Sequence, residues 1–171
     1  VPQEFLDHPS KGSQKDTDAR WTKKNNVSFF GYKNHAKVDA ASKLVTDYNV
    51  TDASVHDSQQ IVGLINERDE YEALYADSAY TGEELHKQLK EKKMCIEIHE
   101  KGYKNKPLTE EQKAENKEKS SIRVRVEHVF GFMENSMGGM VLKNIGLKRI
   151  SACVGLMNLV YNMFRKIQIV G

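Results

Sequence analysis

Apolar residues alternate with polar ones in the first third of the chain, and this period of two predicts a pair of strands. Residues 29–38 combine aromatic and β-branched side chains in rough alternation, and residues 44–50 do the same. A polar turn at residues 39–43 separates them. Such runs are typical of strands joined by a short connection. We therefore predict an antiparallel hairpin over residues 29–50.

The middle of the chain alternates short apolar runs with helical segments. Residues 73–76 form a short apolar run that predicts an interior strand, and residues 94–99 alternate as a further strand. Asp57 is expected to cap a helix through residues 61–65. Residues 81–84 read Thr-Gly-Glu-Glu, a capping box that predicts the start of another helix.

The last third of the chain has the period of helices. Thr109 and Gln112 form a second capping box before a charged helical stretch. From Ile122 the apolar residues recur on one stripe, which ends at the glycine pair 138–139. A last helix carries apolar residues over 150–167, most simply as core packing. The order of elements predicts a mixed α/β fold.

Residues 1–26 differ from the rest because they are polar and have no apolar period, so we expect an extended or disordered lead-in. Residues 27–171 then form one domain, in keeping with 39% hydrophobic and 29% charged residues overall. The chain has neither a long apolar run nor the pattern of a signal peptide. We expect a cytoplasmic bacterial protein, associated with the nucleoid and not with a membrane.

Charge points weakly to a partner. The formal net charge is only +2, which by itself does not indicate nucleic acid. However, Lys and Arg outnumber Glu between Lys101 and Arg125. Such a stretch suits either a solvated surface or contact with phosphates.

Two carboxylates stand where metal-dependent chemistry would need them. Asp77 directly follows the predicted strand at 73–76, and Glu127 lies beside the apolar stripe of a predicted helix, four residues after Arg123. Mg²⁺ prefers oxygen ligands, so one or two carboxylates plus a substrate phosphate can bind it. The pairing is weak alone, because the chain has 24 acidic residues and Asp77 also suits a helix start.

Five segments, in this order, resemble bacterial insertion-sequence transposases of the IS5 family, within the broader IS4-like DDE group. The resemblance runs from about Asp16 to the end of the chain. The segments are Asp16–Trp21, Phe30–His35, Val50–Asp57, Ala76–Tyr80 and Arg123–Gly131.

The resemblance implies a ribonuclease-H-like fold, a mixed sheet flanked by helices, with three acidic residues that hold two Mg²⁺ or Mn²⁺ ions. By motif, Asp77 matches the second catalytic aspartate and Glu127 the glutamate, as catalytic residues and metal ligands. Arg123 matches the arginine of the family's tyrosine-arginine-glutamate-lysine signature. The implied partner is DNA, at transposon ends and target, where metal-dependent cleavage and strand transfer would occur. The predicted DNA contacts are Arg123, Arg125, Lys101, Lys104 and Lys106.

The sequence departs from that family in three places. The signature tyrosine falls at Ser120 and its lysine at Glu134. The first aspartate should end a strand upstream of Asp16, but residues 1–15 contain no β-rich run that ends in Asp. We therefore expect the chain to lack the first, central strand of the sheet, and Asp16 or Asp18 is a poor replacement because neither follows a strand.

This expectation leaves the activity of the chain open. The leading hypothesis is the C-terminal portion of a DDE transposase. One alternative is an inactive remnant that binds DNA or pairs with an intact transposase. Another is a split enzyme completed by an upstream-encoded segment. The histidines at 35, 56 and 128 are most simply hydrogen-bonding packing residues, and Asp39, Asp52 and Asp57 are most simply turn and capping residues.

Overall fold

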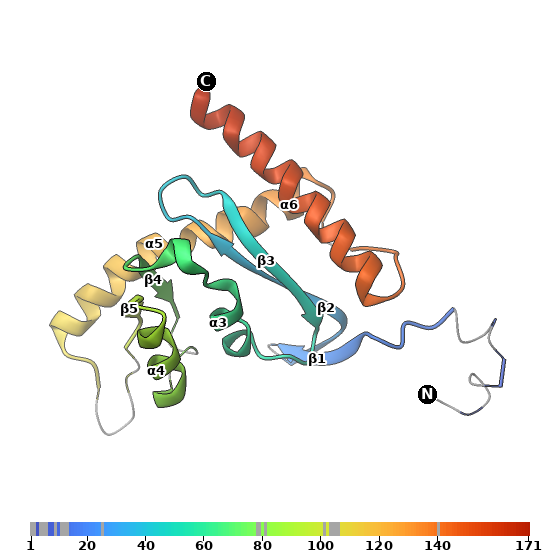
Figure 1. Ribbon diagram of the computed structural model, residues 1–171, viewed down its shortest axis with the longest axis horizontal. Coiled ribbons are helices and arrows are strands. Elements are labelled where there is room, and N and C mark those ends of the chain that lie inside the picture. Colours follow the sequence, from blue (N-terminus) through green and yellow to red (C-terminus); the bar gives the residue numbers. More distant parts are fainter. Residues whose placement is uncertain are drawn as a thin grey trace.

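The computed structural model contains five strands in two sheets among the residues it describes, which are 3, 7, 8, 10, 14–24, 26–77, 80, 82–100, 102, 107–139 and 141–171 (Figure 1). An antiparallel sheet has the order β1–β2–β3, and a parallel pair joins β4 to β5. The strands are β1 (Arg20–Lys24), β2 (Val27–Val38), β3 (Val45–Asp52), β4 (Ala73–Ala76) and β5 (Cys95–Ile98). The mixed α/β prediction is confirmed.

The predicted hairpin is present as β2 and β3. Its register runs from Tyr32 opposite Asp52 to Val38 opposite Val45, with an irregularity between Lys37 and Val38. Two backbone hydrogen bonds close the turn, from Asp39 N to Leu44 O and from Lys43 N to Asp39 O, both 2.9 Å. The segment 39–43 suits a turn because Asp39 begins it, and its carboxylate accepts from Ser42 N at 2.6 Å.

The lead-in ends in a strand that the apolar pattern did not predict. β1 pairs antiparallel with the first half of β2, from Arg20 opposite Gly31 to Lys24 opposite Val27. Trp21 stands opposite Phe30, with ring centroids 5.2 Å apart, yet both rings are largely exposed. Because β1 buries so little, its sequence carries no alternation of apolar and polar residues.

Short helical turns join β3 to β4. They are η1 (Asp57–Gln59), α3 (Ile61–Leu64) and η2 (Glu67–Asp69), and α4 (Glu83–Glu91) follows β4. The prediction that Asp57 caps the helix through residues 61–65 was wrong, because α3 begins after Gln60 without a side-chain cap. The preceding turn η1 is capped by His56, whose Nδ1 accepts from Ser58 N at 3.3 Å. Thr81 lies outside the described residues, and α4 begins after Gly82 without a side-chain cap.

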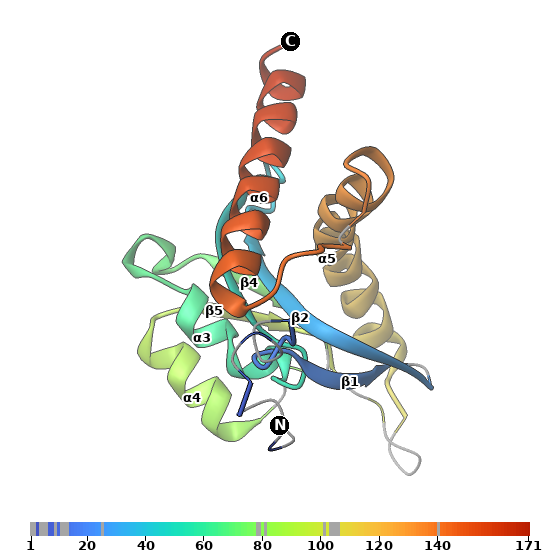
Figure 2. The ribbon, with the colours of Figure 1, turned by 90° about the vertical axis from the view of Figure 1, so that its right-hand side faces the viewer.

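Two long helices complete the chain, α5 (Glu110–Ser136) and α6 (Leu147–Val170) (Figure 2). The predicted capping box of α5 is confirmed, since Thr109 Oγ1 accepts from Gln112 N and Gln112 Oε1 accepts from Thr109 N. The charged stretch and the apolar stripe after Ile122 are one continuous helix of 27 residues. It ends before Gly138 and Gly139, whose φ angles of +81° and +84° favour glycine.

The β2–β3 hairpin carries different chemistry on its two faces, because side chains alternate along a strand. Val45 and its neighbours Ala36 and Val38 pack with α5 and α6. On the opposite face Lys37 Nζ pairs with Asp69 Oδ2 at 2.7 Å. The β4–β5 pair has a separate core, formed by Ile61, Ile65, Ala76, Leu89, Met94 and Ile98. The hairpin therefore meets the β4 side of the molecule through polar contacts.

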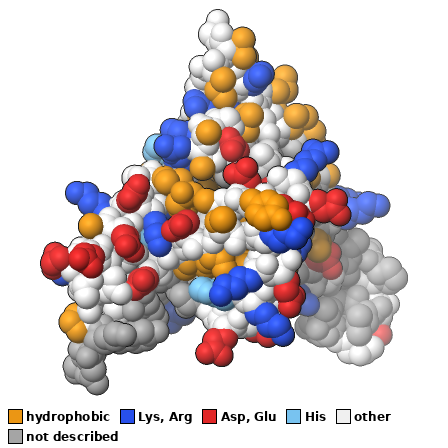
Figure 3. Space-filling model, turned by 60° about the vertical axis from the view of Figure 1, so that its left-hand side comes forward, with side chains coloured by type: hydrophobic (Ala, Val, Ile, Leu, Met, Phe, Trp, Pro, Cys, Tyr) orange, Lys and Arg blue, Asp and Glu red, His pale blue; other side chains and the backbone are white. Residues whose placement is uncertain are grey.

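The outer face of α6 corrects the prediction of core packing. Ile150, Val154 and Tyr161 are buried, but Phe164 is 50% exposed and Ile167 is 67% exposed. Hydrophobic side chains accordingly line the projecting C-terminal part of this helix (Figure 3). Apolar residues recur on both the buried and the exposed face of α6, so their spacing does not reveal which face packs against the rest of the protein. Among the described residues, no helix is long and apolar enough to cross a membrane.

Candidate functional site

Asp77 lies at the carboxyl end of β4, where the sequence placed it. The next described residue, Tyr80, donates its backbone N–H to Asp77 O at 3.1 Å, so the chain turns directly after the strand. Burial raises the pKa of the Tyr80 hydroxyl to about 12, and the carboxylates of Asp57 and Asp77 act in the same direction, whereas Arg123 acts against them. Residues from β4, η1 and α5 thus share one electrostatic environment around this ring.

Glu127 belongs to the same environment through Arg123. Its Oε1 lies 3.1 Å from Arg123 Nη2, one helical turn away on α5. Arg123 Nε is buried and has no hydrogen-bond partner among the residues that the structure describes. A hydrogen bond from this N–H to an anionic acceptor would be strongly favourable, because a buried polar group without a partner costs free energy. Arg123 therefore pairs with one of the two predicted metal ligands, Glu127, and keeps donor capacity for a further anion.

Asp57, in η1, acts on the same Tyr80 hydroxyl, which sequence reasoning missed. Its Oδ1 lies 3.4 Å from both Lys33 Nζ and His35 Nδ1, on β2. Lys33 Nζ also donates to Val55 O at 2.7 Å. The signal was the spacing of Lys33, His35 and Lys37, whose alternate positions place three basic side chains on one face of a strand.

His35 is a buried hydrogen-bonding residue, as predicted. Its Nε2 lies 2.8 Å from Thr51 Oγ1, and that hydroxyl donates to Asp52 O at 3.0 Å. Thr51 Oγ1 therefore accepts a hydrogen bond from Nε2–H, so this ring nitrogen carries a hydrogen. Burial lowers the pKa of His35 below its ordinary value of 6.5, although Asp57 acts in the opposite direction.

We expect the protein to lose stability as the pH falls below 6.5, because the unfolded chain then binds a proton at His35 more readily than the folded chain does. The loss should begin near that pH and stop below the folded pKa. Urea unfolding at about pH 7.5 and about pH 5.5 measures it. His35→Gln should reduce the pH dependence. An unchanged dependence in His35→Gln would contradict this assignment.

Asp16 and Asp18 have structural roles that explain their motif. Asp16 Oδ1 accepts from Tyr32 Oη at 2.5 Å, and Asp18 Oδ2 accepts from Leu147 N, at the start of α6, at 2.9 Å. Burial alone would raise the pKa of Asp16, but the hydrogen bonds from Tyr32 and from the Gly146 backbone hold it below its ordinary value. Both carboxylates are therefore engaged in tying the lead-in to α6.

Of the remaining predicted DNA contacts, the structure describes Arg125 but not the three lysines. Arg125 Nη1 donates to Ala40 O in the β2–β3 turn, so this side chain holds the turn against α5. Lys101, Lys104 and Lys106 lie outside the described residues. A phosphate-binding role for these four residues stays a prediction.

Comparison with known proteins agrees with these motifs. The model of the family described as "Transposase DDE domain" matches residues 5–163. The chain belongs to the DDE transposase domain family. A transposase for insertion sequence element IS1106 from Neisseria meningitidis serogroup B is 33% identical over 138 residues, which are 81% of this chain and 48% of that protein. The chain thus spans about half the length of this relative. No solved structure gives a significant match.

Transposase DDE domains normally use divalent metal ions, and the two matched carboxylates are oxygen donors of the right kind. Within the described parts of the chain, however, no three His, Cys, Asp or Glu side chains are grouped so that they could hold a metal ion. Asp77 and Glu127 are related only indirectly, since Glu127 pairs with Arg123 and both Arg123 and Asp77 act on the Tyr80 hydroxyl.

Proposed function

We propose that this chain is the C-terminal portion of a DDE transposase and acts in DNA transposition at transposon ends. One observation supports the proposal: Asp77, at the end of β4, and Arg123, the ion-pair partner of Glu127 on α5, both act on the Tyr80 hydroxyl. In the reaction, water would attack a phosphodiester and release a 3′ hydroxyl, which would then attack target DNA and displace a 3′ oxygen there. Two Mg²⁺ or Mn²⁺ ions are the cofactors expected for this chemistry.

Asp77 and Glu127 would hold the metal. When bound, a divalent ion supplies charge stabilisation and an activated oxygen nucleophile. Mg²⁺ usually keeps several waters and binds through one or two carboxylates plus substrate phosphates. Asp77 and Glu127 would supply the two carboxylates of such a site, and the DNA would supply the phosphates. Arg123 would neutralise charge between the two carboxylates and donate to a DNA phosphate, which favours binding that depends on salt and little on sequence.

A third carboxylate would come from a segment outside these 171 residues, as the first strand of a ribonuclease-H-like sheet. Two features support this. The segment Tyr32–Val38 of β2 pairs with β3 on one edge, and β4 pairs with β5 on one edge. In the described residues neither segment has a strand on its other edge. Unpaired strand edges readily accept a further strand, because their backbone groups lack partners.

The isolated chain should not perform strand transfer on precleaved transposon-end DNA with Mg²⁺ or Mn²⁺, because the described residues supply an incomplete ligand set. A gel assay for joined products measures this. The comparison experiment uses a longer polypeptide that contains the upstream-encoded segment. We expect this polypeptide to give joined products.

The alternative function is an inactive remnant that binds DNA or pairs with an intact transposase. The absence of a three-ligand group in the described residues favours it. Mixing the isolated chain with the upstream segment as a separate polypeptide distinguishes the two. Restored strand transfer would support a split enzyme. Activity of the isolated chain that vanishes in Asp77→Ala would rule the remnant out.

A further inference from the structure

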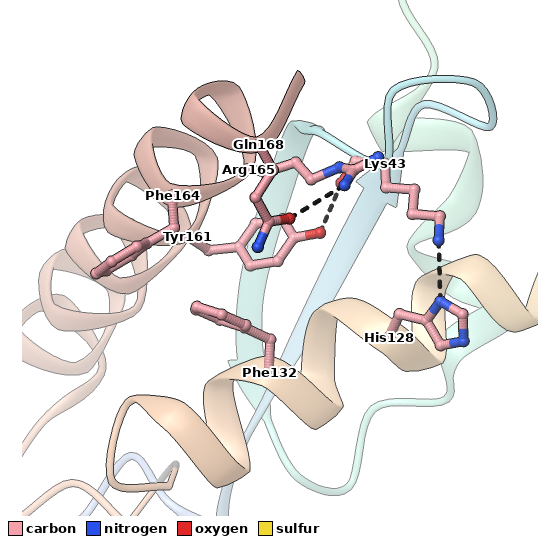
Figure 4. Close-up of a pocket in the computed structure, with 7 residues that line it drawn as sticks. All are labelled: Lys43, His128, Phe132, Tyr161, Phe164, Arg165 and Gln168. Carbon is pink, nitrogen blue, oxygen red and sulfur yellow. Dashed lines mark hydrogen bonds between the residues drawn. The ribbon is translucent and has the colours of Figure 1, made fainter. Parts of the chain in front are cut away.

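A notch between the β2–β3 turn, α5 and α6 has the composition of a nucleotide-binding site. Its cavity volume is about 150 Å³. The β2–β3 turn and α5 form one side of the notch, and α6 forms the opposite side (Figure 4). The lining residues are Lys43, His128, Phe132, Tyr161, Phe164, Arg165 and Gln168. Three of them are basic, three are aromatic and none is acidic.

The basic residues converge from different elements. Lys43 Nζ lies 3.2 Å from His128 Nδ1, so the ammonium donates to the imidazole and keeps its other two N–H donors. Arg165 donates from Nε to Ser42 O at 2.7 Å and from Nη1 to Gln168 Oε1 at 3.1 Å. Within the described residues, Nη2 of Arg165 makes no hydrogen bond. The helix α6 contains no Asp or Glu to neutralise these groups.

The turn is held in a conformation that directs Lys43 toward α5. Lys43 has φ of +62°, which is uncommon for a residue other than glycine. Tyr161 Oη donates to Lys43 O at 2.9 Å, and Arg165 binds the carbonyl of the preceding residue. Lys43 therefore projects across the notch toward His128 (Figure 4). A fixed cation of this kind loses less freedom on binding an anion than a mobile surface lysine does.

The aromatic residues form a wall beside the cations. The Phe132 ring lies 5.6 Å from both Tyr161 and Phe164, measured between centroids. Phe164 is 50% exposed, so part of this residue is accessible to a partner. Aromatic faces next to phosphate-binding cations are the usual arrangement for unpaired bases, because every base can stack.

We propose that this notch binds one unpaired nucleotide of a DNA strand, with its phosphate at Lys43, His128 and Arg165 and its base against Phe164 and Phe132. His128 directly follows Glu127 on α5, but consecutive helical residues face different directions, so the notch opens on another face of α5 than the one that carries Glu127. The inference rests on the proposed function for its choice of DNA as ligand. Its residues are otherwise separate from Asp77 and Glu127.

Binding of oligothymidylate and of an abasic sugar-phosphate oligomer of equal length tests this proposal, by fluorescence anisotropy in EDTA at several salt concentrations. Lys43→Gln should weaken both complexes and reduce the salt slope by roughly one phosphate contact. Gln keeps an unbranched stem, so the backbone strain is unchanged. Lys87→Gln, at an exposed position on α4, is the matched control and should change little.

Phe164→Leu separates stacking from charge. It should weaken binding of oligothymidylate roughly 5- to 100-fold and leave the abasic oligomer unaffected. Phe29→Leu is the matched control, since Phe29 on β2 is 52% exposed and lies outside the notch. Circular dichroism and thermal unfolding of each variant verify the fold.

Three results would overturn the proposal. They are no binding of oligothymidylate by the wild-type chain at low salt, equal effects of Lys43→Gln and Lys87→Gln, and equal loss for both oligomers in Phe164→Leu. EDTA removes divalent metal, so these outcomes do not depend on Asp77 and Glu127. If cleavage by the longer polypeptide survived Asp77→Asn while the notch variants behaved as expected, the proposed metal site would fail and the notch would stand.

Discussion

Asp77→Asn should lower DNA cleavage roughly thousandfold or more in a polypeptide that includes the upstream-encoded segment. The amide keeps the shape of the side chain but removes the negative charge that a divalent metal needs. Glu127→Gln should have a similar effect for the same reason. Single-turnover cleavage of end-containing DNA with Mg²⁺ measures both.

The control for this experiment is Glu115→Gln, an exposed acidic position on the same helix as Glu127. It should cleave like the wild type. The fold should survive Glu127→Gln, because this side chain is 57% exposed and its ion pair with Arg123 is of the surface type. Cleavage retained in either Asp77→Asn or Glu127→Gln would refute the assignment of that residue.

Met133→Ala should destabilise the protein by about 2–4 kcal/mol. Met133 is 0% exposed and packs between α5, α6 and the hairpin, in a cluster with Val45, Val129 and Tyr161. Its truncation removes buried apolar surface and leaves a cavity where three elements meet. Urea unfolding followed by circular dichroism gives the change in free energy.

Met163→Ala is the matched control, since Met163 is 59% exposed on the outer face of α6. It should cost less than about 0.5 kcal/mol, as exposed positions usually do. A cost equal to that of Met133→Ala would mean that the outer face of α6 is covered in solution.

Much of the secondary structure follows from local patterns. The β2–β3 hairpin, β4, β5 and the Thr109 cap were predicted correctly, because alternation and capping spacing reflect contacts between residues close in sequence. β1 and the cap at His56 were missed. β1 is largely exposed and has no apolar period, and a histidine cap is rarer than the Asp that follows it.

The sequence predicted the two carboxylates of the site but not the residues that surround them. The motifs placed Asp77 at a strand end and Glu127 on a helix beside Arg123. No local pattern indicated that Asp57 and Tyr80 share the surroundings of Arg123 and Asp77, or that Arg125 is directed to the β2–β3 turn. Those contacts join segments far apart in the chain, and the spacing of residues within one element carries no information about them.

The sequence by itself determined the family, the order of elements and the two carboxylates at 77 and 127. The tertiary structure decided what stands around them. It brought Asp57, Asp77 and Arg123 within electrostatic reach of Tyr80, engaged Asp16 and Asp18 with other partners, and formed the Lys43–His128 notch from a turn and two helices. The physical reason is that period and capping report which face of an element is apolar, whereas the partner of each face depends on how all the elements pack together.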